Sequence, residues 1–123
     1  MSIDNTVAWF EVATDNAQDA EEFYGELFGW TFESDPNVSD GLDYRLISSR
    51  GAEAASGGLM VTGGRLPNHS VFYVAVADLA EACERVEKLG GSVVLSQPDA
   101  TPAFAYVQDR SGNQFGIFTP AAK

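Results

Sequence analysis

Hydrophobic and polar residues follow two different periods in the first third of the chain. Residues 6–12 form a β-branched and aromatic run, which is typical of a strand. After Asp15-Asn16, apolar residues recur every three or four positions, which predicts a helix that ends at Gly29. We expect Phe23 and Leu27 to pack against the strand and Glu21 to lie on the solvated face. The apolar positions of this helix are Ala17, Ala20, Phe23, Tyr24, Leu27 and Phe28.

Strands are predicted to fill the remainder of the first half. Residues 30–33 begin a second strand, residues 36–41 form a polar loop, and residues 43–49 and 57–61 give two more strands. The glycine- and proline-containing segment 63–68 then divides the chain near its middle.

The second half repeats this order of elements. Residues 70–76 read as a strand, Asp78 caps a helix, and Gly90-Gly91 ends it. Residues 92–95, 103–108 and 114–119 read as three strands, with a tight turn at 109–113. The apolar stripe of this second helix comprises Leu79, Ala82, Cys83, Val86 and Leu89.

The order β-α-β-β-β therefore occurs twice. The two opening strands superpose when Val7 is placed on Val71, and each is followed by a capped helix that ends in glycine. The two halves share the order of their elements but few identical residues, and this combination indicates an internal duplication.

Two segments resemble the vicinal oxygen chelate superfamily, which includes glyoxalase I, the bleomycin resistance proteins and the extradiol dioxygenases. Residues 23–30 (FYGELFGW) are similar to its segment after the first helix, and residues 109–115 (DRSGNQF) to its turn before the last strand. Arg110 stands where that turn usually has proline. The resemblance covers nearly the whole chain.

The resemblance implies an α+β fold in which tandem βαβββ modules form a curled mixed sheet around an open cleft. We expect one domain over residues 1–123, with modules at about 5–62 and 69–120. Family members commonly associate in pairs and hold a divalent metal and a small ligand in the cleft.

The residues at the family's metal positions do not fit a cation. Three positions fall close to Val7, Val71 and Gly116, and the fourth strand offers only residues 57–61. Divalent ions of this class need several His, Asp, Glu or Gln donors converging at about 2 Å. With one histidine in the chain, we expect no metal and no cofactor.

Strand parity predicts which residues line the cleft, because successive side chains point to opposite faces. Ala8, Phe10 and Val12 form one apolar face of the first strand, so Trp9 and Glu11 face the other way. The same reasoning, applied to the fifth, seventh and last strands, gives the other residues that we expect to line the cleft. The predicted ligand-binding residues are Trp9, Glu11, Tyr73, Phe104, Tyr106, Gln114 and Phe118.

Two residues are candidates for catalysis, and each has a structural alternative. Glu11 lies in an otherwise apolar strand, where a carboxylate acts as a base or binds a cation, or else is simply solvated. His69 is either a general base at the rim of the cleft or a surface residue in a Pro-Asn-His turn. Cys83 lies on a helical apolar stripe, which favours burial over reactivity.

Composition narrows the list of partners. Eighteen acidic and seven basic residues give a formal charge of −11, which disfavours nucleic acid and mildly favours neutral or cationic ligands. No apolar run is long enough to cross a bilayer, and the first residues lack the pattern of a signal peptide. A single cysteine is consistent with the cytoplasm.

Three functions remain open. The first is a metal-free homodimer that binds a small organic molecule in an aromatic cleft. The second is a metal-independent lyase or isomerase that uses Glu11 with Tyr73 or His69 as acid-base groups. The third is an interaction module without a small ligand. Glyoxalase I activity is not expected, because the metal is its catalytic centre.

Overall fold

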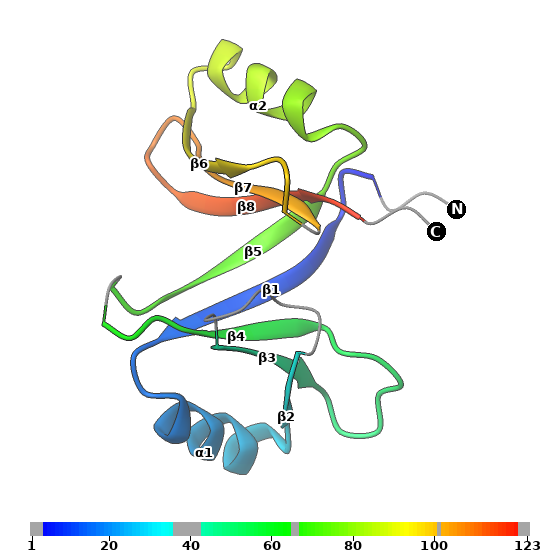
Figure 1. Cartoon of the computed structure of the whole chain (residues 1–123), viewed down its shortest axis with the longest axis vertical. Helices are drawn as coiled ribbons and strands as arrows, with labels where there is room; N and C mark the ends of the chain where they lie inside the picture. The colour runs from blue at the N-terminus through cyan, green and yellow to red at the C-terminus, as the bar shows by residue number, and fades with distance from the viewer. Residues whose placement is uncertain (1–3, 36–42, 65–66, 101, 121–123) are drawn as a thin grey trace. The chain divides into compact units, whose positions relative to one another are not determined.

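The computed structural model describes residues 4–35, 43–64, 67–100 and 102–120. In this part of the chain, two helices and eight strands follow one another as β-α-β-β-β twice (Figure 1). The α+β class and the order of elements predicted from the sequence are confirmed. The polar loop predicted at 36–41 lies outside the described residues.

The chain divides into two compact units. The N-terminal unit comprises residues 9–70, and the C-terminal unit comprises residues 71–123 together with residues 1–8. The elements are β1 (Val7–Thr14), α1 (Ala17–Phe28), β2 (Thr31–Ser34), β3 (Asp43–Ser48), β4 (Gly57–Val61), β5 (His69–Ala75), α2 (Leu79–Lys88), β6 (Ser92–Gln97), β7 (Ala103–Gln108) and β8 (Gln114–Thr119).

Each unit has the same strand pairing. In the N-terminal unit, β4 pairs antiparallel with β3 and β3 with β2, whereas β4 pairs parallel with β1. In the C-terminal unit, β8 pairs antiparallel with β7 and β7 with β6, whereas β8 pairs parallel with β5. This repeated pairing is the structural counterpart of the repeat seen in the sequence.

The helix caps lie where the sequence places them. The side chain of Asn16 accepts a hydrogen bond from the Asp19 backbone N–H at 3.1 Å, and that of Asp78 accepts one from Glu81 at 3.1 Å. Gly29 ends α1 with φ of 74°, a left-handed conformation that favours glycine.

The turn before β8 closes without a proline. The Asp109 carboxylate accepts hydrogen bonds from the backbone N–H groups of Ser111 and Asn113 and from the Asn113 amide. These bonds, led by that of the Asn113 side chain, lower the pKa of Asp109. The guanidinium of Arg110 also donates to the Leu89 carbonyl, which joins this turn to the end of α2.

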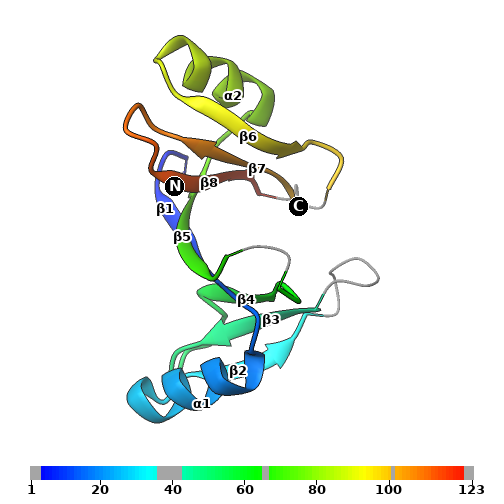
Figure 2. The same cartoon turned by 90° about the vertical axis from the view of Figure 1, so that its left-hand side faces the viewer.

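The core of the C-terminal unit lies between α2 and the sheet (Figure 2). Cys83 packs beside this core, and burial raises the pKa of its thiol, so the thiol stays protonated at neutral pH. The prediction for Leu89 is wrong, since this side chain is exposed at the end of the helix. The buried core residues are Val76, Leu79, Ala105, Val107 and Ile117.

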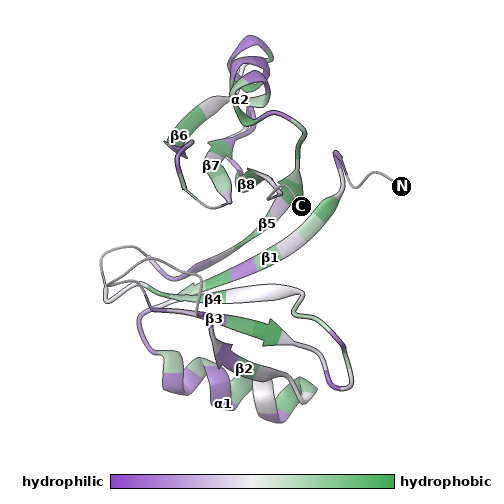
Figure 3. Cartoon of the chain, turned by 45° about the vertical axis from the view of Figure 1, so that its right-hand side comes forward, coloured by the Kyte–Doolittle hydropathy of each residue, from purple (hydrophilic) through white to green (hydrophobic). Residues whose placement is uncertain are grey.

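The predicted orientation of α1 is wrong. Phe23 and Leu27 are 62% and 57% exposed, and no residue of α1 is buried. Tyr24 instead stacks on Trp30, with ring centroids 5.4 Å apart, and Trp30 lies 5.5 Å from Phe10 of β1. Figure 3 shows that hydrophobic and hydrophilic residues are mixed along α1.

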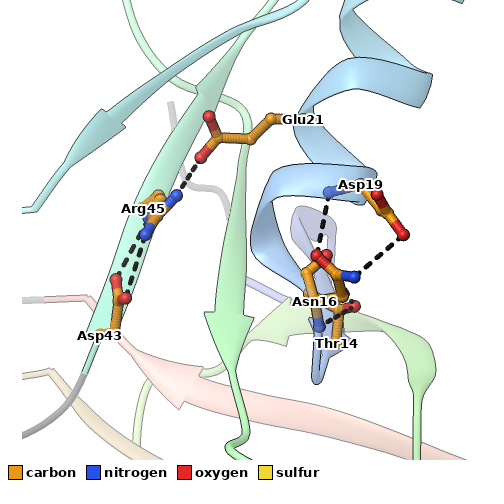
Figure 4. Close-up of polar contacts among 6 residues, drawn as sticks. All are labelled: Thr14, Asn16, Asp19, Glu21, Asp43 and Arg45. Carbon is orange, nitrogen blue, oxygen red and sulfur yellow. Dashed lines mark hydrogen bonds and ion pairs between the residues drawn. The ribbon is translucent and has the colours of Figure 1, made fainter.

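An ion pair accompanies this orientation. Arg45 of β3 binds Glu21 of α1 and Asp43 of its own strand (Figure 4). Hydrogen bonds from Arg45 to Asp43 and Glu21 raise the pKa of its guanidinium still further. Because Glu21 turns toward the sheet, Phe23, two residues along the helix, turns toward solvent.

Candidate functional site

The strands of the C-terminal unit have the parity predicted from the sequence. Ile117 and Val107 belong to the core beneath α2, so the residues that alternate with them point to the opposite face of the sheet. In register, Gly116 lies between Tyr73 on β5 and Tyr106 on β7.

Four aromatic rings gather on this opposite face, which we call the aromatic face: Tyr73, Phe104, Tyr106 and Phe118. Ring centroids are 6.0 Å apart for Tyr73 and Tyr106, 6.2 Å for Tyr73 and Phe118, and 5.8 Å for Phe104 and Tyr106. Tyr73 and Tyr106 are 6% and 9% exposed, whereas Phe104 and Phe118 are half-buried. Gln114 is half-buried at the start of β8.

Gly116 lies directly beneath the ring of Tyr73. A Cβ atom at this position would be 2.3 Å from Cε2 of Tyr73, which is closer than non-bonded carbons approach. The sequence showed only that Gly116 is no metal ligand. The structure shows that its missing side chain leaves the space that the tyrosine ring occupies.

The N-terminal unit has a second aromatic group around Glu11. The indole Nε1 of Trp9 donates a hydrogen bond to the hydroxyl oxygen of Tyr44 at 3.0 Å. Glu11 is opposite Gly58 in the sheet, and a Cβ atom on Gly58 would be 2.0 Å from that hydroxyl. Glu11 itself is 3% exposed.

Sequence reasoning missed Tyr44. The available signal was its place in an alternating strand beside the Gly57-Gly58 pair, since glycine in a strand often marks a close approach of another group. The contact itself joins β3 to β1, which are not consecutive in the chain, so no local pattern gives it.

His69 lies at the first position of β5, and its Nδ1 is 2.8 Å from the Pro67 carbonyl oxygen. It lines a groove at the junction of β1 and α1 that does not include Glu11. The structure therefore assigns His69 and Glu11 to different surroundings within the N-terminal unit.

The residues present do not fit a divalent metal. Val7 is exposed, Val71 is buried, and neither offers a donor atom, while Tyr73 covers Gly116. Within residues 4–35, 43–64, 67–100 and 102–120, no three His, Cys, Asp or Glu side chains come together in a way that would hold a metal ion.

A sequence profile of the glyoxalase-like domain matches residues 9–118, which is most of the chain. This chain belongs to the glyoxalase-like domain family. The fold and the recognition of the vicinal oxygen chelate superfamily from the sequence are thereby confirmed.

Relatives of this glyoxalase-like domain come from bacteria and a fungus. The glyoxylase CFP32 of Mycobacterium tuberculosis is 31% identical over 121 residues, covering 94% of this chain and 44% of that protein. The domain thus spans less than half the length of its mycobacterial relative. A glyoxylase-like domain-containing protein of Didymella fabae is 27% identical over 128 residues, with 100% of both chains covered.

Solved structures show the same fold at low identity. Methylmalonyl-CoA epimerase from Mycobacterium tuberculosis matches with a TM-score of 0.67 and 19% identity, covering 99% of this chain and 92% of that one. Protein BH1468 from Bacillus halodurans matches with a TM-score of 0.70 and 12% identity, covering 96% of each. Neither helix of the described residues is long and apolar enough to cross a membrane.

Proposed function

We propose that this glyoxalase-like domain binds a small planar organic molecule on the aromatic face. The observation that carries the proposal is the gathering of four rings on the side of the sheet opposite α2. On the helix side, by contrast, the buried core consists of aliphatic side chains, with Phe115 packed against it. Two rings of the aromatic face remain half-exposed and are available for stacking.

Two further observations support binding of an organic molecule without a metal. Val7, Val71 and Gly116 have no donor groups, which favours recognition through stacking and hydrogen bonds. The formal charge of −11 favours neutral or cationic ligands over polyanions.

Thermal shift measurements test this proposal. EDTA-treated protein is heated with antibiotics, thioesters, flavins and metabolites, each with and without added nickel or zinc. We expect an organic ligand to raise the melting temperature in a saturable way, because binding to the folded state stabilises it by mass action. Phe118→Leu should weaken this shift, since it removes a half-exposed ring and keeps an apolar side chain.

Phe72→Leu is the matched control. Phe72 lies in the same unit but stacks on Phe115 on the helix side, with centroids 5.3 Å apart. This variant should keep the ligand-induced shift. Loss of the shift in Phe72→Leu but not in Phe118→Leu would contradict binding on the aromatic face, and a shift produced by metal alone would return a metal site to consideration.

A second candidate function is acid-base catalysis by Glu11. The specific observation is a carboxylate that is 3% exposed on the same strand face as Trp9. A carboxylate placed within a strand of the sheet can act as a general base when a substrate comes within hydrogen-bond reach. Such a group suits removal of a proton next to a carbonyl, the chemistry of a metal-independent isomerase or lyase.

Proton exchange in D₂O tests the catalytic candidate. Carbonyl compounds found by thermal shift are incubated with the protein, and loss of the proton next to the carbonyl is followed by NMR. Glu11→Gln should abolish exchange while the melting temperature stays close to that of the wild type. Glu33→Gln, which changes an exposed glutamate of β2, should leave exchange intact. Undiminished exchange in Glu11→Gln would exclude Glu11 as the base.

We infer further that the domain acts as a homodimer in the cytoplasm, with no nucleic-acid or membrane partner. The single cysteine and the acidic charge support this placement. Sedimentation equilibrium that returns only the mass of one chain, 13.2 kDa, would contradict the homodimer.

A further inference from the structure

The aromatic face continues beyond its four rings into a pair of glutamines. Val107 packs in the core beneath α2, so Gln108, the next residue of β7, points to the aromatic face. On β8, Phe115 packs against the same core, so Gln114 points to the aromatic face as well. The two glutamines therefore lie at the end of this face that adjoins the turn at 109–113.

Gln108 and Gln114 are direct neighbours across the sheet. They are paired in register in the antiparallel ladder of β7 and β8, where the Cβ atoms of opposite residues are about 5 Å apart. Both side chains are half-buried. Among the residues that the structure describes, neither glutamine side chain is hydrogen-bonded to another residue. Two amide groups, each with a donor and an acceptor, are therefore available side by side.

The strands place no charge on this face. Within the C-terminal unit, the residues of β5–β8 that point to it include no Asp, Glu, Lys or Arg, although charged residues make up 20% of the whole chain. Asp109 follows Gln108, but its carboxylate closes the turn by accepting hydrogen bonds from Ser111 and Asn113. The face therefore offers stacking and amide hydrogen bonds without a countercharge, which favours a neutral ligand.

A pair of adjacent amides is complementary to an imide, which has a ring N–H between two carbonyl groups. The oxygen of a glutamine amide can accept a hydrogen bond from that N–H, and the amide nitrogens can donate to the two carbonyls. A purely apolar edge would displace water from both glutamines without replacing its hydrogen bonds, which costs affinity. The glutamine pair thus favours a ligand edge that both donates and accepts.

The spacing between the glutamines and the half-buried phenylalanines indicates the size of the ligand. Phe104 and Gln108 are four residues apart, as are Gln114 and Phe118, and four residues of a strand span about 13 Å. A hydrogen bond covers about 3 Å of this length, so about 10 Å remains for the ligand. Three fused six-membered rings have this length, whereas a single ring contacts only the phenylalanines or only the glutamines.

We propose that the aromatic face is specific for a neutral planar heterocycle of fused rings that carries an imide edge. The fused rings lie over Phe104 and Phe118, and the imide lies against Gln108 and Gln114. This inference rests on the function proposed for the aromatic face, to which it adds the class of ligand and the two residues that select it.

Two matched probes test the proposal on the full-length chain. Lumiflavin is a neutral three-ring imide, and 3-methyllumiflavin is the same ring system with a methyl group in place of the imide proton. Titrations are followed by the change in flavin fluorescence. We expect lumiflavin to bind in a saturable way and about three- to tenfold more tightly than 3-methyllumiflavin, the usual effect of one hydrogen bond.

Gln108→Leu and Gln114→Leu remove the two amides one at a time and keep side chains of similar size. Each variant should lower the affinity for lumiflavin about three- to tenfold and the affinity for 3-methyllumiflavin by less, so the preference for the imide shrinks. Gln18→Leu is the matched control, since it changes an exposed glutamine of α1 in the other unit and should leave both affinities unchanged. Circular dichroism checks that all three variants are folded.

Equal affinity of the wild type for the two probes would overturn the proposal, because recognition would then not involve the imide proton. If Phe118→Leu still weakened both probes, the aromatic face would remain a stacking site without this selectivity, so the two proposals fail separately. Absence of saturable lumiflavin binding would also overturn it. So would an imide preference that is lost only in Gln97→Leu, because Gln97 lies opposite Phe104 at the other end of the face.

Discussion

At the scale of single residues, the glycines in strands have a role that the sequence does not reveal. Gly58 and Gly116 each lie beneath a tyrosine side chain, from Tyr44 and Tyr73 respectively. Gly63 and Gly64, in the segment predicted to divide the chain, instead have positive φ, as glycines in turns often do. In the two strands, glycine is required because any Cβ atom would collide with a ring.

Gly116→Ala should destabilise the protein by about 1–3 kcal/mol, the usual range for overpacking a well-filled site. The added methyl group must displace the Tyr73 ring, because it would be 2.3 Å from it. Urea unfolding followed by circular dichroism measures the change.

Gly25→Ala provides the matched control for this substitution. Gly25 lies within α1, where an added Cβ atom meets only the Trp30 carbonyl oxygen at 3.6 Å, an ordinary contact. Alanine should stabilise the helix there by about 0.5–1 kcal/mol. If Gly116→Ala were as stable as the wild type, the Tyr73 ring would not occupy that space.

At the scale of elements, the two helices contact their sheets by different means. α2 buries Leu79 and packs Cys83 and Val86 against the core of its unit. α1 buries no residue, and it is positioned by Tyr24 on Trp30 and by the Glu21–Arg45 ion pair. The apolar stripe predicted α2 well because burial determines its orientation. It failed for α1 because no residue of this helix is buried.

Phe23→Ala should change the free energy of unfolding by no more than about 0.5 kcal/mol, as expected for an exposed side chain. Leu59→Ala should cost about 2–5 kcal/mol, because Leu59 is 0% exposed in β4 of the same unit. Chemical denaturation of both variants checks the difference. A large loss of stability in Phe23→Ala would mean that α1 faces the sheet as its sequence pattern predicts.

At the scale of the whole molecule, the two units have the same strand topology but different side chains on their strands. Both units pair a central glycine-containing strand antiparallel on one side and parallel on the other. One unit places Trp9, Glu11 and Tyr44 on its strands, whereas the other has the aromatic face. Duplicated strands with different side chains permit different ligand chemistry on each unit.

The sequence by itself determined the order of elements, their caps and the parity of the strands that carry the aromatic face. These features depend on local periodicity and on residues close in the chain. Asn16 caps the helix by accepting a hydrogen bond from Asp19, three residues away, and Tyr73 and Ala75 share a strand face because they are two residues apart. Three features were decided only by tertiary structure: the orientation of α1, the contact of Tyr44 with Trp9, and the groove around His69. Each depends on residues far apart in the chain, such as Arg45 with Glu21 or Asp15 with Asn68. The periodicity of the sequence does not predict such contacts, because they depend on how the strands and helices pack in three dimensions.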